Sequence, residues 1–202
     1  MTVAADHVAR LASHYGAADG RLTIALLNAG WPTRTARLSL DSRSWVVKDW
    51  PGFEPARRKR VLADQRVLFD WLAGAGAPVP ALLPQSAGAD WLEFRDEPGS
   101  PRLAGSRDLA RMASAATALA GLHALPAPGF LPAWREDLWA HFSSPEPAPA
   151  GGAASSPVLV HGDFHPGNLL WSGARCCVFD WDHACVGPRG FDVAHFRVDM
   201  VL

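Results

Sequence analysis

Short runs of alternating apolar and polar residues predict a small antiparallel sheet in the first half of the chain. Turn residues separate the first three runs, as expected of strands joined by hairpins. The four expected strands span residues 21–27, 34–40, 43–49 and 89–95. An amphipathic helix is expected ahead of them, at residues 4–15.

A longer helical pattern lies between the third and the fourth of these runs. It begins at Pro55, a residue favoured in the first turn of a helix, and continues to about Ala73. The pattern places a set of apolar residues on one side of the expected helix. The residues on that side are Val61, Leu62, Val67, Leu68 and Leu72.

The second half of the chain changes to helical periodicity, interrupted by short strands. Helices are expected at residues 106–125, 134–142 and from Phe191 onward, and short strands at residues 158–160, 169–171 and 175–181. Residues 145–157 are rich in Pro, Ala, Gly and Ser and are expected to form a flexible linker. The whole pattern predicts an α+β fold of two lobes, with a small antiparallel sheet in residues 1–95 and a helix-rich lobe in residues 96–202.

A polar loop follows the short strand at residues 158–160. It holds Asp163 and Asn168, and the next hairpin delivers Asp180 at the end of a strand. Oxygen ligands such as those of Asn168 and Asp180 suit Mg²⁺, which usually shares its coordination with substrate phosphates. Asp163 is then free to accept a proton from an attacking hydroxyl group. In the alternative interpretation, these residues only serve a polar surface turn.

The order of these polar residues matches the phosphoryl-transfer layout of protein kinases. His161, Asp163 and Asn168 reproduce the spacing His-x-Asp-x-x-x-x-Asn, and Asp180 follows on a strand. Phosphoryl transfer depends on positioning and charge neutralisation more than on covalent chemistry, and these residue types supply both. The loop therefore predicts a phosphotransferase that uses ATP and Mg²⁺.

A kinase layout also predicts a lysine on the third strand of the first lobe, for the α- and β-phosphates. Lys48 lies in that strand, and the only other lysine of the chain is Lys59. The alternative for Lys48 is an ordinary solvent-facing strand lysine. The turn before the second strand is expected to cover the phosphates, and Gly30 is its single glycine. The alternative for that turn is a plain hairpin connection.

Composition narrows the set of partners. The 202 residues carry a formal net charge of -1, so neither nucleic acid nor a membrane is expected as a partner. The basic cluster at residues 57–60 is interpreted as the solvated start of a helix, because no aromatic residues interleave with it.

The N-terminus has no apolar signal stretch and no run reaches about 20 apolar residues, which predicts a cytoplasmic protein. The adjacent Cys176 and Cys177 are expected to pack in the core.

Further motifs surround the polar loop. The loop and the strand after it read HGDFHPGNLL at residues 161–170, followed by VFDWD at 178–182, GP at 187–188 and FDVA at 191–194. Upstream, residues 119–123 read LAGLH, residues 76–80 read GAPVP and residues 67–68 read VL. These motifs resemble the aminoglycoside phosphotransferase and choline kinase-like superfamily, whose fold is protein-kinase-like, and together they run over most of the chain.

The resemblance implies a role for each residue of the loop. Asp163 corresponds to the catalytic base, and Asn168 and Asp180 to the ligands of the magnesium that bridges the phosphates of ATP. Lys48 corresponds to the lysine of the α- and β-phosphates. His165 corresponds to a position close to the γ-phosphate.

The resemblance also implies residues that support the site. Phe94, Arg95 and Asp96 correspond to the hinge whose backbone meets adenine. Asp192 corresponds to a structural aspartate that braces the catalytic loop. His161 likewise corresponds to a residue that holds the loop.

Two features depart from the pattern of the superfamily. Its members usually pair the strand lysine with a glutamate on the first-lobe helix, and here that helix offers Asp64 or Gln65. The sequence also stops soon after Asp192, whereas relatives continue with helices that shape the acceptor pocket. A C-terminal lobe of abbreviated form is therefore expected.

Three functions remain as hypotheses from the sequence. The first is a small-molecule kinase that phosphorylates a hydroxyl group, and the second is a nucleotide-binding pseudokinase or inactive remnant. The third is a zinc hydrolase built from His161, Asp163 and His165 with His183 or Cys185, since zinc accepts mixed ligands of this kind. The acceptor of a kinase is left open, because aminoglycosides, choline, homoserine, sugars and other antibiotics all occur among relatives. The oligomeric state is left open as well.

Overall fold

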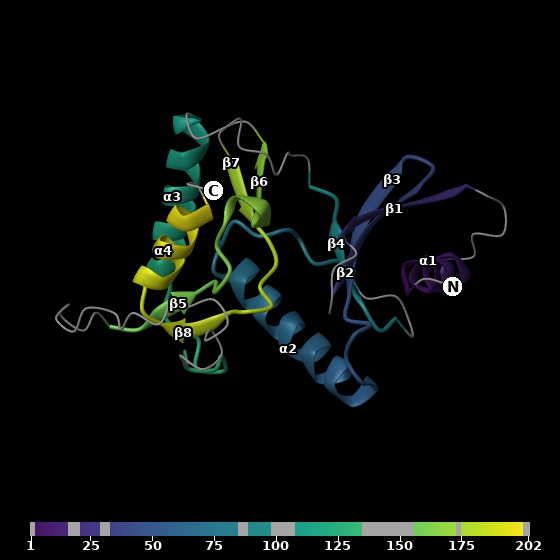
Figure 1. Cartoon of the computed structure of the whole chain (residues 1–202), viewed down its shortest axis with the longest axis horizontal. Coiled ribbons are helices and arrows are strands. Elements are labelled where there is room, and N and C mark those ends of the chain that lie inside the picture. The colour runs from purple at the N-terminus through teal and green to yellow at the C-terminus, as the bar shows by residue number, and fades with distance from the viewer. Residues whose placement is uncertain are drawn as a thin grey trace. The chain divides into compact units, whose positions relative to one another are not determined.

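The structure is a computed structural model that describes residues 3–15, 21–28, 33–84, 89–97, 108–134, 156–172 and 175–199. The chain divides into two compact units, residues 1–97 and 98–202 (Figure 1). The sequence places this boundary after residue 95. Each unit contains its own helices and strands.

The first unit is built on a four-stranded antiparallel sheet in the order β1-β2-β3-β4. Its elements are α1 (Val3–His14), β1 (Leu22–Asn28), β2 (Arg34–Leu40), β3 (Arg43–Asp49), α2 (Pro55–Gly74) and β4 (Leu92–Arg95). The predicted helices and the first three strands are confirmed within about two residues at each end, which is the usual uncertainty of such boundaries. The fourth strand begins later than predicted, at Leu92.

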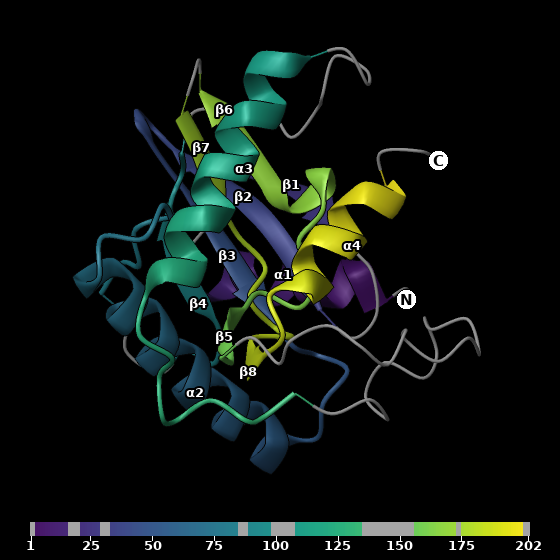
Figure 2. The same ribbon diagram turned by 90° about the vertical axis from the view of Figure 1, so that its left-hand side faces the viewer.

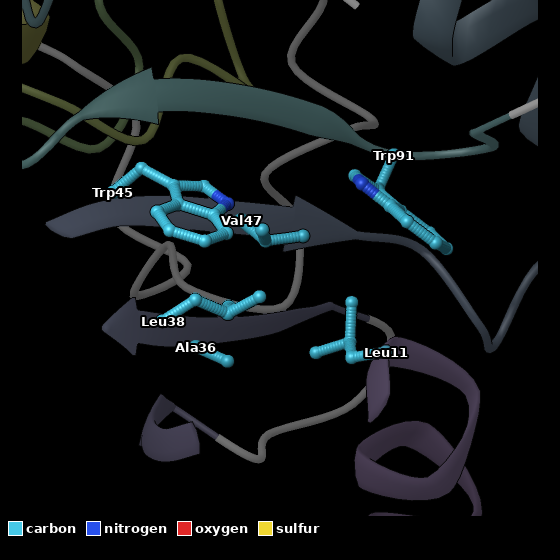
Figure 3. Close-up of a cluster of buried hydrophobic side chains, with 6 residues drawn as sticks. All are labelled: Leu11, Ala36, Leu38, Trp45, Val47 and Trp91. Atoms are coloured by element: carbon cyan, nitrogen blue, oxygen red, sulfur yellow. The ribbon is translucent and has the colours of Figure 1, made fainter. Parts of the chain in front are cut away.

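Helix α1 covers one face of this sheet. Leu11 of α1 packs with Ala36 and Leu38 of β2 and with Trp45 and Val47 of β3, and all are buried (Figure 3). Alternate residues of a strand point to the same face of a sheet. The buried residues of β2 and β3 are therefore the ones that the alternation of apolar and polar residues in the sequence predicts. Each such buried side chain stabilises the fold by about 1.5–3 kcal/mol.

Helix α2 packs against the opposite face of the sheet. Phe94 of β4 pairs in register with Val46 of β3. Val46 lies between Trp45 and Val47 in β3, so its side chain points to the face opposite to α1. The ring of Phe94 contacts the ring of Phe69 of α2, with 4.8 Å between the two centroids. The buried residues of α2 are Leu62, Gln65, Leu68, Phe69 and Leu72. The expected place of Val67 on this face is wrong, because its side chain is 51% exposed and the helix turns Gln65 and Phe69 inward instead.

The second unit combines helices with two short two-stranded sheets. Its elements are α3 (Leu109–Ala124), β5 (Val158–Val160), the 3-10 helix η3 (Pro166–Asn168), β6 (Leu169–Ser172), β7 (Arg175–Val178), β8 (Cys185–Gly187) and α4 (Gly190–Asp199). Strands β6 and β7 form the predicted hairpin, and β5 pairs with β8, a strand that the sequence did not predict. Helices α3 and α4 lie side by side (Figure 2).

The core of the second unit places the polar loop between its two small sheets. Val158, Val160 and Cys185 form a buried cluster with Trp134 and Phe191 packed against it. Since β5 leads directly into the loop and β6 follows it, both ends of the loop are anchored in regular structure. The predicted α+β class is confirmed by these elements.

Some expectations lie outside the described residues. These include Gly30, nearly all of the helix predicted at residues 134–142, and the linker predicted at residues 145–157 apart from its last two residues. Within the described part of the chain, no helix is both long and apolar enough to cross a membrane.

The buried thiols give a prediction about reactivity. Cys176 and Cys185 are free and buried, and burial raises the pKa of each thiol to about 11. Because the thiolate is the reactive form, we expect iodoacetamide at pH 8 to modify the partly exposed Cys177 well before the other two. Timed alkylation followed by peptide mass spectrometry measures the order, and denatured protein, in which all three thiols react, is the control. Early labelling of Cys176 or Cys185 in the folded protein would contradict the buried placement.

Candidate active site

The carboxylate of Asp192 holds the beginning of the polar loop. Its Oδ1 accepts the backbone N–H of Gly162 at 2.9 Å, and its Oδ2 accepts the backbone N–H of His161 at 3.0 Å. The same Oδ2 lies 3.0 Å from Nε2 of His123, in the last turn of α3. Asp192 lies in the first turn of α4 and is fully buried, so one carboxylate joins the loop to both helices of this unit.

Gly162 is required where the loop makes its first turn. Its φ is 85°, in the left-handed region that favours glycine. A Cβ atom at this position would lie 2.3 Å from the backbone oxygen of His183. The chain therefore passes close to the segment that follows β7, which only a residue without a side chain permits.

The ring of His161 ties the loop to the end of β7. Its Nδ1 accepts the backbone N–H of Asp163 at 3.1 Å, and its Nε2 lies 3.0 Å from the carbonyl oxygen of Phe179, to which it donates. Burial lowers the pKa of His161, which keeps the ring neutral. Because both ring nitrogens are engaged within the protein, His161 has the contacts of a residue that holds the loop rather than of one that transfers protons.

Asp163 and Asn168 form a directly bonded pair. Nδ2 of Asn168 donates to Oδ2 of Asp163 at 2.8 Å and to the Asp163 carbonyl oxygen at 3.0 Å. The amide nitrogen is thus used inside the loop, which leaves the side-chain oxygen of Asn168 as the atom able to bind a cation. The 3-10 helix η3 ends at Asn168, which is buried, so the position of the pair is fixed by the turn.

Asp180 lies at the same end of the β6–β7 hairpin as Asn168. Leu169 pairs in register with Val178, and the backbone N–H of Phe179 donates to the carbonyl oxygen of Asn168 at 3.1 Å. Asp180 itself has a φ of 65°, a left-handed conformation that costs roughly 1–3 kcal/mol in residues other than glycine and clusters at functional sites. The backbone therefore brings Asn168 and Asp180 to the same end of the hairpin, and their joint role as metal ligands stays a prediction.

Two histidines flank the carboxylate of Asp163. Nε2 of His165 lies 3.6 Å from Oδ2, and Nδ1 of His195 lies 3.6 Å from Oδ1. Burial alone would raise the pKa of Asp163, but the hydrogen bond and charge of His165, followed by His195 and Asn168, lower it to about 2. Asp163 is therefore an ionised carboxylate at neutral pH.

Sequence reasoning did not identify His195. It follows Asp192 by three residues in α4, and residues three apart lie on the same face of a helix. Since Asp192 binds the loop, this spacing was the available signal that His195 also faces it. The contact of His123 with Asp192 was missed as well, although LAGLH was recognised as a motif.

Lys48 is buried in β3 of the first unit, with 8% of the residue exposed. It pairs in register with Thr35 of β2 and Leu92 of β4, and it shares the α2 side of the sheet with Val46 and Phe94. Its Nζ lies 5.3 Å from the ring centroid of Trp50. The alternative of a solvent-facing lysine is thereby excluded.

Helix α2 turns an amide, not a carboxylate, towards the side of the sheet that bears Lys48. Gln65 is buried on α2, whereas the side chain of Asp64 is exposed. This corrects the expectation for Asp64 as a partner of the lysine, because adjacent residues of a helix point about 100° apart. Of the two expected positions, only Gln65 faces the interior.

The predicted hinge residues have distinct environments. The side chain of Phe94 is buried against α2, and the carboxylate of Asp96 accepts from Arg37 at 2.9 Å and from Ser44 at 2.6 Å. The backbone N–H of Arg95 donates to the carbonyl oxygen of Ala81 at 2.8 Å. This N–H group is therefore already bonded within the first unit, and the assignment of Phe94, Arg95 and Asp96 as the hinge that meets adenine stays a prediction.

The zinc alternative does not fit the geometry. Among the described residues, no group of three or more histidine, cysteine or acidic side chains is arranged to hold a metal ion. His161 uses both ring nitrogens within the protein, Cys185 packs in the core, and His183 is exposed. The candidate ligands of zinc are thus not gathered at one point.

Known proteins with similar sequences are phosphotransferases. The sequence matches the APH phosphotransferase enzyme family over residues 23–151 and 137–200. Over 48 residues it is 40% identical to methylthioribose kinase of Bacillus pumilus, a match that covers 24% of this chain and 12% of that protein. Methylthioribose kinase of Geobacillus thermodenitrificans is 42% identical over 45 residues, which cover 22% of this chain and 11% of that protein. The matched segments therefore span only a small part of these relatives.

Solved structures show the same fold at low sequence identity. A choline/ethanolamine kinase family protein from Mesorhizobium loti is 17% identical with a TM-score of 0.66, covering 99% of this chain and 71% of that chain. Aminoglycoside-3'-phosphotransferase of type VIII is 19% identical with a TM-score of 0.66, covering 94% and 83%. A mutant of aminoglycoside phosphotransferase APH(4)-Ia in complex with ADP and hygromycin B is 17% identical with a TM-score of 0.61, covering 92% and 74%. The kinase-like fold, the polar loop and the match over most of its length together show that the chain belongs to the phosphotransferase enzyme family.

Proposed function

We propose that the protein transfers the γ-phosphate of ATP to a hydroxyl group of a small molecule, with Mg²⁺ as cofactor. The observation that carries the proposal is the bonded pair of Asp163 and Asn168, with Asp180 at the same end of the hairpin. The family match supports the reaction class, and a nucleotide-bound relative of the same fold supports ATP as the donor.

The proposed reaction gives Asp163 one task. The oxygen of the acceptor hydroxyl attacks the γ-phosphorus, the bond from that phosphorus to the bridging oxygen breaks, and ADP leaves with the electron pair. The hydroxyl proton passes to Asp163, which orients the hydroxyl before attack. A carboxylate whose pKa is about 2 is ionised and ready to accept a hydrogen bond from the acceptor, although it is a weak base.

The residues present fit a magnesium ion. Hard cations prefer oxygen ligands, and the side-chain oxygen of Asn168 and the carboxylate of Asp180 supply two of them. When bound there, Mg²⁺ would neutralise charge on the ATP phosphates. Lys48, on the sheet of the first unit, is proposed to bind the α- and β-phosphates.

A screen for ADP release tests the proposal. The purified chain is incubated with ATP, Mg²⁺ and single acceptors, chosen as methylthioribose, choline, ethanolamine, hygromycin B, homoserine and simple sugars. We expect ADP release to rise above the acceptor-free rate with at least one class. Equal rates with and without every acceptor, in protein shown to bind ATP, would contradict transfer to a small-molecule hydroxyl.

Removal of the Asp180 carboxylate, a proposed metal ligand, should raise the Mg²⁺ concentration that activity requires. We expect Asp180→Asn to raise the Mg²⁺ concentration needed for half-maximal activity roughly 10- to 100-fold, because a neutral amide binds a hard cation less strongly. Activity is measured over a magnesium titration, with and without EDTA. Asp108→Asn is the matched control, since Asn caps a helix as well as Asp and Asp108 caps α3. An unchanged magnesium requirement in Asp180→Asn would contradict its assignment.

One observation favours a second candidate, a protein that binds nucleotide without turnover. Helix α2 turns the uncharged Gln65 inward where active relatives are expected to carry a glutamate for the lysine. Titration of the protein with ATP, alongside the acceptor screen, separates the two candidates. Binding without transfer to any acceptor would favour this second function.

A further inference from the structure

His195 faces the carboxylate of Asp163 from helix α4. Its Nδ1 lies 3.6 Å from Oδ1 of Asp163, on the oxygen opposite to the one that Asn168 and His165 contact. The ring of His195 lies 5.9 Å from that of His165 and 6.2 Å from that of Phe191, measured between centroids. The two oxygens of Asp163 thus have different partners, and His195 is the neighbour of Oδ1.

The orientation of the His195 ring points to the same partner. Its Nδ1 is buried and has no hydrogen bond within 3.5 Å among the described residues, although a quarter of the side chain is exposed. A buried ring nitrogen without a partner is costly, and a small movement of Asp163 Oδ1 would satisfy it. Hydrogen bonds at catalytic groups are often long until substrate binds.

We propose that His195 is a positioning residue of the phosphotransfer site, which holds Oδ1 of Asp163 through Nδ1–H while Asn168 and His165 hold Oδ2. The proposal rests on the function proposed above. A carboxylate held at both oxygens cannot rotate about its Cβ–Cγ bond, so the lone pair that meets the acceptor hydroxyl keeps one direction. Well-oriented groups of this kind account for much of the rate advantage of enzymes.

The anchoring of α4 makes this arrangement rigid. Asp192, one helical turn before His195, binds the backbone at His161 and Gly162, so the helix and the loop move as one. His195 therefore reaches Asp163 from an element that is already fixed to the start of the same loop. A side chain on a fixed helix positions its partner better than one on a free loop.

Two substitutions separate positioning from packing. His195→Phe keeps a planar ring beside Phe191 but has no donor, and His195→Asn keeps a donor near the Nδ1 position but has no ring. If His195 positions Asp163, we expect Phe to lower kcat roughly 10- to 100-fold at unchanged KM for ATP, and Asn to recover much of the loss. The exposed neighbour Ala194→Asn controls for the lower helix propensity of Asn. Full activity of the Phe variant, or equal losses in both variants with a lower Tm, would overturn the proposal.

A second measurement needs neither ATP nor an acceptor. In ¹⁵N–¹H spectra of the imidazole nitrogens, the His195 signals are assigned by their loss in His195→Phe. We expect a proton on Nδ1 in the wild type and a shift of the Nδ1 signal in Asp163→Ala. An Nδ1 signal that is the same with and without the Asp163 carboxylate would overturn the proposal. If the wild type transfers no phosphate, the proposed function fails while these spectra still decide the role of His195.

Discussion

Replacement of Asp163 by Asn is expected to lower kcat for phosphate transfer by about 10³-fold, in line with the loss of a positioned acid–base group. The variant keeps the size of the side chain and an oxygen for the Asn168 amide, so the loop should retain its conformation. An amide, however, neither accepts the hydroxyl proton nor offers a negative charge to His165 and His195. The affinity for ATP should stay within about threefold of the wild-type value, because the lost interaction is made in the transition state and not in the complex with ATP.

Asp108→Asn serves as the matched control for this prediction. It makes the same chemical change at the cap of α3 and should leave kcat unchanged. Initial rates over a range of acceptor concentrations give kcat, and calorimetry gives the affinity for ATP. A kcat within tenfold of the wild type in Asp163→Asn would show that another group activates the acceptor.

Replacement of Asp192 by Ala is expected to lower the free energy of unfolding by about 3–5 kcal/mol, because a buried network would lose the partner that joins it. The change leaves the backbone N–H groups of His161 and Gly162 buried without an acceptor, and removes the partner of His123. Single domains are stable by only about 5–15 kcal/mol, so this loss is a large fraction of the total. The molecules that remain folded should also lose activity, since the loop begins at these two N–H groups.

Urea denaturation measures this effect. Asp192→Asn keeps one acceptor oxygen and should lie between the wild type and Asp192→Ala. The control Asp108→Asn should change stability by less than about 1 kcal/mol, because Asn also caps the helix and only a part-exposed ion pair with Arg111 is lost. A loss below about 1 kcal/mol in Asp192→Ala would mean that other groups satisfy the backbone of the loop.

Local patterns in the sequence were sufficient for most of the fold. Strands β2, β3 and β5 have the expected bounds because their alternation and turn residues lie within a few positions of each other. The loop with Asp163 and Asn168 was predictable for the same reason, since its chemistry is contained in eight consecutive residues. Strand β8 was not predictable, because its three residues are recognisable only by their pairing with the distant β5.

The residues that were missed depend on contacts between distant segments. His195 and His123 lie on two helices that meet the loop only in the folded chain. The bond of the Arg95 N–H to Ala81 is likewise a contact of the folded chain. The errors at Asp64 and Val67 have another cause. Apolar residues are distributed almost evenly around α2, so the sequence does not indicate which side of the helix faces the sheet. In a helix with a clear apolar stripe, the stripe itself predicts the buried side.

The most direct test of the account is to follow the γ-phosphate of ATP by ³¹P NMR in the presence of Mg²⁺ and the best acceptor from the screen. The account predicts that the wild type produces ADP together with an equal amount of a new phosphomonoester, and that both signals disappear in Asp163→Asn and on addition of EDTA. Inorganic phosphate as the only product, or phosphomonoester formed at the wild-type rate by Asp163→Asn, would contradict the account.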